Sequence, residues 1–357
     1  MVKMKKNIFK SPVAFLSVAF LLCIIFAAIF AEFIAPYSIS TENRLNAYAP
    51  VSKLHFFDSN GTFSFIPFVY SLEPGLDGNN FRKYYENKNK KYFVKFFCKG
   101  DSYSLFGKIK MDIHLFGVDA PGALNLAGTD MRGRDLFSRI CFGARVSLSI
   151  AIIGAFISFF IGSFLGGISG YFGGVTDHVI MRGSELFMML PGFYILLAVR
   201  SAIPPSVGTF YIYCIVVCVI SLIGWAGTAR VIRGLVLSIR ENDFVAAAWL
   251  CGAGHLKIIR KHILPHTIPY LSVAVSTAVP GYIMGESALS MLGLGIQEPM
   301  VSWGMLLMDS LQITQLCFYP WLLIPGIVII CTILSINCLG DFLRETTDPR
   351  ACFNKKV

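Results

Sequence analysis

Charged side chains are scarce in this sequence. Asp, Glu, Lys and Arg make up 15% of its 357 residues, whereas 55% are hydrophobic and the mean hydropathy is +0.64. Several apolar runs are longer than the helices of a soluble core, so this composition excludes an ordinary soluble globular protein. We predict an all-α polytopic membrane protein.

Motifs for catalysis and nucleotide binding are also missing. The sequence has no GxxxxGK[ST] loop to hold nucleotide phosphates, no HExxH and no GxSxG. The ten cysteines are scattered without a CxxC pair, and His262 and His266 lie in a basic stretch and flank a proline, so we predict no metal site. These absences argue against an enzyme and against a cofactor bound by this chain.

The net charge of +10 does not indicate a nucleic-acid partner. Lysines and arginines lie mostly beside the apolar runs and in one polar segment, rather than in a cluster the size of a binding groove. Membrane topology explains the flanking ones, because basic residues accumulate in cytoplasmic loops.

Six apolar runs predict six membrane spans. They cover residues 11–31, 146–176, 181–203, 209–229, 267–285 with a continuation beyond Glu286, and 316–339. The first could be a signal peptide, but it is longer than the apolar region of one, which favours an uncleaved span. The third is bracketed or entered by Arg182, Glu185 and Arg200, so we expect neighbouring helices to shield it.

The basic residues of the short loops predict the orientation. Four lysines precede the first run, six Lys or Arg lie in 228–268 and four lie in the tail, whereas 204–208 and 297–315 contain none. This asymmetry places both termini and the 230–268 loop in the cytoplasm. The predicted order is a cytoplasmic 1–11, a first span at 12–35, an extracytoplasmic insert at 36–127, a five-span core at 128–342 and a cytoplasmic tail at 343–357.

The insert is predicted to be rich in β-strands. Residues 109–115 alternate between apolar and polar side chains, and 92–97 form an aromatic-rich run. Basic residues cluster at 82–95. They form either a solvated face or a contact with anionic lipid headgroups or a docking protein.

Carboxylates and guanidiniums alternate where the insert leads into the second run. Asp130, Arg132, Arg134 and Asp135 can pair with one another, and the neighbouring glycines allow a compact turn. We predict a structured collar at this position, on the extracytoplasmic side.

A polar interval at 241–266 separates the fourth and fifth runs. Three alanines at 246–248 favour a helix from Asp243 to Cys251, which Gly252 and Gly254 are expected to end. A second helical segment is predicted at 256–263, before Pro265 and Pro269 redirect the chain into the next span.

Two of these stretches resemble the C-type permease subunit of oligopeptide and dipeptide ABC importers. Residues 128–148 are similar to its GTDxxGRDxxSRxxxGxRxSL signature, and Ala247, Ala248, Gly252, Ile263, Leu264 and Pro265 match the family's EAA loop in residue and spacing. Further likenesses lie at 170–182, 286–306 and 325–350. Ala246 stands where the family usually has Glu, which puts a salt bridge from this position to an ATPase in doubt.

The resemblance implies a type I ABC importer permease fold of about six transmembrane helices, with the insert between spans one and two. It also implies a B-type permease partner in a heterodimer, two ATPase subunits that carry ATP and Mg, an extracytoplasmic peptide-binding protein, and a place in the bacterial inner membrane. Asp243, Ala246, Ala247, Ala248, Gly252, Ile263, Leu264 and Pro265 are then the ATPase-coupling residues. Peptide is the implied cargo, with nickel or another small solute as the alternative.

Glu286 is the acid in the predicted fifth span. An acid there is costly unless it faces water, a partner or a pathway, so it is a candidate for the translocation route; local pairing at the outer interface is the alternative. An ATP-independent secondary carrier would need ion-coupling acids and repeated halves. Glu286 alone does not satisfy that requirement.

Overall fold

The computed structural model describes residues 11–59, 61–76, 78, 81–105, 107–204 and 206–347, without the side chains of 269, 272 and 345–347. The chain divides into two compact units. We call residues 1–21, 148–289 and 331–357 the helical unit, and residues 22–147 and 290–330 the sheet unit. Residues 1–10 of the predicted cytoplasmic N-terminus and residues 348–357 of the predicted cytoplasmic tail lie outside the described residues.

Four helices in the described residues are long and apolar enough to cross a membrane. They are α2 (Pro12–Ile29), α4 (Leu136–Phe172), α7 (Thr209–Ile239) and the segment 320–344, which includes most of α13 (Ile324–Thr347). Two bent pairs raise the number to six if each pair counts as one span. The predicted mostly helical, multi-pass architecture is confirmed.

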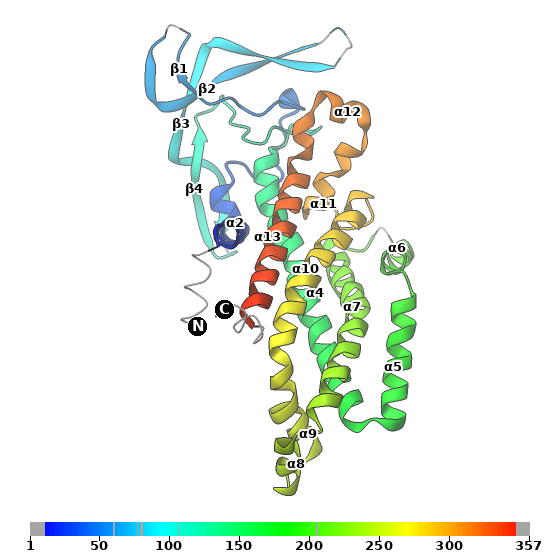
Figure 1. Cartoon of the computed structure of the whole chain (residues 1–357). Coiled ribbons are helices and arrows are strands. Elements are labelled where there is room, and N and C mark those ends of the chain that lie inside the picture. Colours follow the sequence, from blue (N-terminus) through cyan, green and yellow to red (C-terminus); the bar gives the residue numbers. More distant parts are fainter. Residues whose placement is uncertain are drawn as a thin grey trace. The chain divides into compact units, whose positions relative to one another are not determined.

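The predicted third span is a broken one. α5 (Gly174–Met189) and α6 (Gly192–Ala202) meet at an 80° bend, and Figure 1 shows α6 nearly end-on above α5. The break falls at Leu190 and Pro191, and Leu190 is extended with φ −81° and ψ 125°. A residue before proline avoids the helical region because the proline ring crowds it, which explains a break at this point.

Two helices extend further into charged sequence than the hydropathy predicts. α4 begins at Leu136 rather than near 146, and α7 continues to Ile239 rather than ending near 229. The Arg145 guanidinium in α4 donates two hydrogen bonds, of 2.7 and 2.8 Å, to the Glu32 carboxylate. The Arg233 guanidinium in α7 donates two hydrogen bonds of 2.5 Å to the Asp177 carboxylate. Paired guanidiniums can therefore remain in helices that also cross the membrane.

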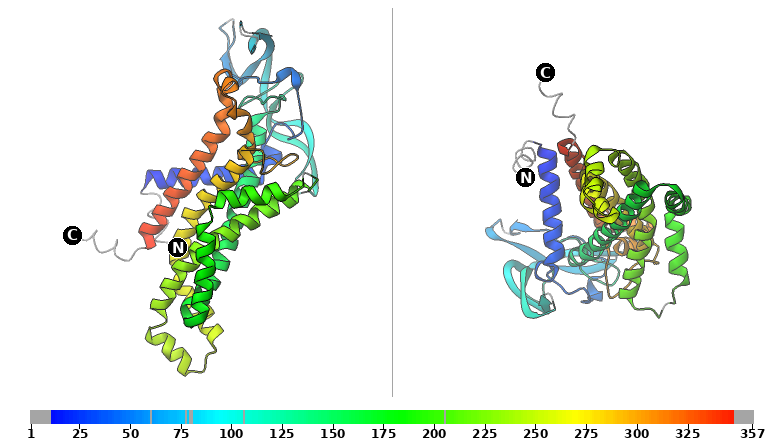
Figure 2. Two further views of the ribbon diagram at one scale, coloured as in Figure 1. Left: turned by 90° about the vertical axis from the view of Figure 1, so that its right-hand side faces the viewer. Right: turned by 90° about the horizontal axis from the view of Figure 1, so that it is seen from below.

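Glycines allow α4 and α7 to approach closely in the helical unit. A Cβ atom at Gly162 would lie 2.6 Å from Thr228, and one at Gly166 would lie 2.4 Å from the Ala229 carbonyl oxygen. Figure 2 shows these two helices and α5 packed alongside one another. Small residues at this spacing therefore serve helix packing.

The sheet unit contains four antiparallel strands in the order β1-β2-β3-β4 (Figure 1). They are β1 (His55–Phe57), β2 (Phe63–Leu76), β3 (Arg82–Leu105) and β4 (Ile109–Val118). Val69 of β2, Val94 of β3 and Leu124 form a buried cluster. The strands predicted at 92–97 and 109–115 are confirmed, and both are longer than the patterns indicated.

Residues 290–330 of the sheet unit include the buried Trp303. They form the short helices α11 (Trp303–Leu306), η3 (Met308–Leu311), α12 (Ile313–Phe318) and η4 (Pro320–Leu323). The Trp303 side chain is fully buried; its backbone N–H donates to Ser147 Oγ at 3.1 Å and its Nε1–H to the Ile140 carbonyl at 3.0 Å. These bonds attach the 290–330 segment to the first turns of α4.

Candidate functional site

The polar interval of the helical unit folds into a short helix with one buried side. α8 (Asp243–Leu250) buries Val245 in a cluster with Ile232 and Val236 of α7 and with Ile258 and Ile263. Much of the remaining helix surface is uncovered: Trp249 is 61% exposed and Leu250 is 79% exposed. Ala246 and Ala247 are also exposed, whereas Ala248 is half-buried.

A Schellman motif ends α8. Gly252 has φ +76°. Its N–H donates to the Trp249 carbonyl oxygen at 2.9 Å, and the Ala253 N–H donates to the Ala248 carbonyl oxygen at 3.1 Å. Glycine accepts this left-handed backbone without a Cβ clash, so the predicted role of Gly252 as helix terminator is confirmed. Gly254 has φ −65° and ψ 151° and instead caps the start of α9 (His255–Ile258).

The predicted second helix is continuous with the next span. α9 leads into a π-helical turn, η2 (Ile259–Ile263), and then into α10 (Leu264–Met291). Pro265 lies just after this wide turn, where the Leu264 N–H bonds to the Ile259 carbonyl. A proline cannot donate and its ring crowds the preceding turn, so a local π turn accommodates it. The chain bends by 75° between 255–268 and 273–291.

Two polar contacts join this loop to the end of α4. The Tyr171 hydroxyl lies 2.9 Å from His255 Nδ1, and Arg240 Nη1 donates to the Gly170 carbonyl at 3.2 Å. Tyr171, Arg240 and Ala246 are among the residues that line a recess of about 280 Å³. A glutamate at position 246 would therefore enter a recess that already contains a guanidinium.

Glu286 lies in α10 and is 1% exposed. Its carboxylate is enclosed by the chain, so it lies in the interior of the fold rather than at a free surface. The predicted pathway role stays a prediction.

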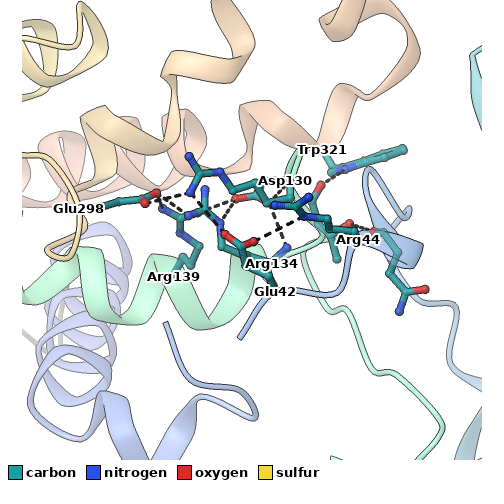
Figure 3. A network of polar contacts seen from close by, with 10 residues as sticks. Glu42, Arg44, Asp130, Arg134, Arg139, Glu298 and Trp321 are labelled. Atoms are coloured by element: carbon teal, nitrogen blue, oxygen red, sulfur yellow. Dashed lines mark hydrogen bonds and ion pairs between the residues drawn. The ribbon is translucent and has the colours of Figure 1, made fainter. Parts of the chain in front are cut away.

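The predicted collar is a compact ion-pair network in the sheet unit (Figure 3). Asp130 Oδ2 accepts from Arg134 Nε at 2.7 Å and from Arg139 Nη1 at 2.5 Å, and its Oδ1 accepts from the backbone N–H groups of Arg132 and Arg134 at 2.9 and 3.0 Å. Asp130 and Arg139 are each 2% exposed. The turn requires Gly133, which has φ +73°, because a Cβ there would lie 1.8 Å from the Asn43 carbonyl oxygen.

A distant acid completes the network. Glu298 Oε1 accepts from Arg134 Nη1, Glu298 Oε2 lies 3.1 Å from Arg132 Nη1, and Arg139 lies 3.6 Å away. Burial raises the pKa of Glu298, but the hydrogen bond from Arg134 and the charges of the three arginines outweigh it and hold the pKa below 4.5. Sequence reasoning missed Glu298 and Glu42, which lies 3.3 Å from Arg132. The available signal was the local excess of arginine over acid around Asp130.

Asp135 does not join the arginines. Its Oδ2 accepts from the Ser138 backbone N–H at 2.7 Å and from Ser138 Oγ at 2.6 Å, which caps the first turn of α4. The side chain is 5% exposed, and burial raises its pKa to about 6 although the Ser138 bonds lower it. The expected pairing of alternating acids and arginines therefore holds for Asp130 and not for Asp135.

Two family models match this chain. The one for the binding-protein-dependent transport system inner membrane component matches residues 142–351, and the one for the N-terminal TM domain of oligopeptide transport permease C matches residues 4–50. These ranges leave out 51–141, which contains the four strands.

Curated relatives agree with these matches. The chain is 42% identical over 224 residues to the oligopeptide transport system permease protein OppC of Haemophilus influenzae, an alignment that covers 62% of this chain and 70% of the relative. It is 39% identical over 231 residues to the dipeptide transport system permease protein DppC of Bacillus subtilis, which covers 64% and 70%.

Proposed function

The chain belongs to the family of binding-protein-dependent transport system inner membrane components, and we propose that partner ATPases move it through the α8 helix. It is a non-catalytic permease subunit of an oligopeptide or dipeptide ABC importer. Such systems include ATPase and binding-protein partners. The proposal assigns the two ATPases to the cytoplasmic side, a B-type permease to a heterodimer with this chain, and peptide as the cargo.

The uncovered side of α8 carries the proposal. Ala246, Ala247, Trp249 and Leu250 present exposed apolar surface on a helix that Val245 anchors in the α7 cluster. Exposed apolar surface of this kind marks a site where a protein partner binds. The small alanines allow close approach, and the anchored side passes a displacement on to the spans.

The coupling mechanism follows from these attachments. When the ATPases close on ATP, the force on α8 reaches α7 through Val245, α4 through Tyr171 and His255, and α10 through the continuous α9–η2 segment. The permease then shifts between two packed states, and the partner supplies the free energy for the shift. Hydrolysis reverses it.

Two native cysteines provide a test of this arrangement. Cys251, at the end of α8, and Cys317, in α12, are both exposed. A membrane-impermeant maleimide should label Cys317 in right-side-out vesicles and Cys251 in inside-out vesicles stripped of ATPases. Rebinding the ATPases should then protect Cys251. Peptide mapping by mass spectrometry identifies the labelled site, with Cys251→Ser and Cys317→Ser as controls.

Two results would end the proposal. One is labelling of Cys251 from the outside, which would reverse the orientation. The other is equal labelling of Cys251 with and without bound ATPases, which would leave α8 without its partner.

A further inference from the structure

Two adjacent phenylalanines on β3 are uncovered. Phe96 is 69% exposed and Phe97 is 67% exposed, although neighbouring Val94 is buried in the core of the sheet. Regular strands send successive side chains to opposite faces, so one of two neighbours normally faces the core. Here both rings remain outside it.

The backbone at this point is strained. Phe97 has φ +54°, a left-handed conformation that costs a bulky residue about 1–2 kcal/mol. The pairing with β4 keeps one register on either side, with Phe96 opposite Phe116 and Cys98 opposite His114, so no inserted residue forces the irregularity. Strain that the strand pairing does not explain indicates a functional contact for the ring.

The Phe97 ring lies beside the end of the first span. The Phe97 ring lies 6.2 Å from the ring of Phe33 in α3 (Ala31–Ile34), directly after α2. Phe26 and Ile29 of α2 are about half exposed, as lipid-facing side chains are. Within the sheet unit, Figures 1 and 2 both show one end of the sheet beside the end of α2.

Polar groups next to Phe33 mark the depth of this surface. Glu32 and Arg145 form the bidentate ion pair described above, which belongs at the edge of the hydrocarbon layer rather than inside it. Lys95 and Lys99 flank the two phenylalanines. Lys95 pairs with Asp119, and the highly exposed Lys99 lies 3.9 Å from Asp112. Aromatic rings beside lysines at a span end are typical of the membrane–water interface.

We propose that Phe96 and Phe97 anchor the insert in the membrane. The two rings enter the headgroup–acyl boundary of the leaflet next to the insert, and Lys95 and Lys99 remain at the level of the lipid headgroups. The sheet is thereby attached to the bilayer at the end where β3 pairs with β4, and the end where β1 pairs with β2 stays in water. This inference depends on membrane residence alone and not on the cargo or on ATPase coupling.

Paramagnetic relaxation of a fluorine label tests the anchor. The complete importer, with 4-trifluoromethyl-phenylalanine at position 96, is reconstituted in phosphatidylcholine nanodiscs. Relaxation is measured with lipids that are spin-labelled near the top of the acyl chain, and separately with a water-soluble gadolinium chelate. The same label at Phe65, a 91% exposed aromatic on β2, is the matched control.

At position 96, the spin-labelled lipid is expected to relax the fluorine label more strongly than the gadolinium chelate does. At position 65, the chelate is expected to have the stronger effect. A label at 96 that the chelate relaxes as strongly as the label at 65 would overturn the proposal. So would a label at 96 that neither reagent reaches, or that becomes protected only when the binding protein is added, because a protein partner would then cover the rings.

Discussion

The Tyr171 hydroxyl at the end of α4 lies 2.9 Å from His255 Nδ1 at the start of α9. This contact connects the segment after α8 to a different span from the one that Val245 contacts. We expect Tyr171→Phe to remove the bond, worth about 0.5–1.5 kcal/mol, and to keep the ring contacts. The number of ATP molecules hydrolysed per peptide imported should rise, as measured in proteoliposomes of the complete importer.

Tyr211→Phe is a suitable control for that variant. Tyr211 is 66% exposed near the start of α7, so loss of its hydroxyl should leave the ratio unchanged. An unaltered ratio in Tyr171→Phe would mean that the α4 contact does not transmit the movement.

Gly252 and Gly254 form a natural pair for testing the end of α8. A Cβ atom would meet nothing within 4 Å at either position, so they differ in backbone conformation rather than in space. Gly252→Val should cost at least the roughly 1–2 kcal/mol of a left-handed L-residue and misalign α8. Uptake should fall while membrane insertion and ATPase activity remain. Gly254→Ala, at φ −65°, should transport normally. Normal uptake by Gly252→Val would contradict the coupling role.

The collar predicts unequal effects of removing its acids. Asp130→Asn leaves Arg139 buried without its closest negative partner, which should destabilise the protein by about 3–5 kcal/mol. Glu42→Gln removes a partner of the half-exposed Arg132 and should cost less than about 1 kcal/mol. Thermal unfolding of the two variants in detergent measures the difference. Equal melting temperatures would show that the buried pair contributes no more than the exposed one.

Stability should increase when the pH is lowered from 7.5 to 5. Asp135 has a folded pKa of about 6, above its ordinary 3.8, so the folded state binds a proton more tightly than the unfolded state. Protonation below pH 6 therefore stabilises the fold, by about 1 kcal/mol at pH 5. Burial also raises the pKa of Asp309, which acts in the same direction. Glu298 has a lowered pKa and adds stability that is lost only below about pH 4.5.

Asp135→Asn isolates that contribution. Asparagine still caps a helix but does not titrate, so the variant should gain about 1 kcal/mol less than the wild type over the same pH interval. Melting temperatures of both proteins at pH 7.5 and 5 provide the comparison. An identical pH response in the two would show that Asp135 does not titrate in this range.

Local patterns predicted much of this fold. Apolar runs located the spans, alternation located two of the strands, and Gly252 marked the end of α8, because each of these signals depends on neighbouring residues. The break at Pro191 had a local signal too, but span length alone concealed it.

Long-range pairing was not predictable in the same way. Helix α4 starts ten residues early because Arg139 and Arg145 find acids on other segments, and hydropathy counts a paired charge like a free one. Asp135 was assigned to the collar by its charge, whereas a Ser three residues later makes it a helix cap. The contacts of the ATPase, the pathway and the cargo depend on chains that this sequence does not encode.

Glu298 has a consequence for biosynthesis. It is 164 residues from Arg134, so Arg132, Arg134 and Arg139 are translated long before it, when Asp130 and Glu42 are the acids of the network already present. Until residue 298 has been synthesised, the network therefore lacks the acid that lies within 4 Å of Arg132, Arg134 and Arg139 alike.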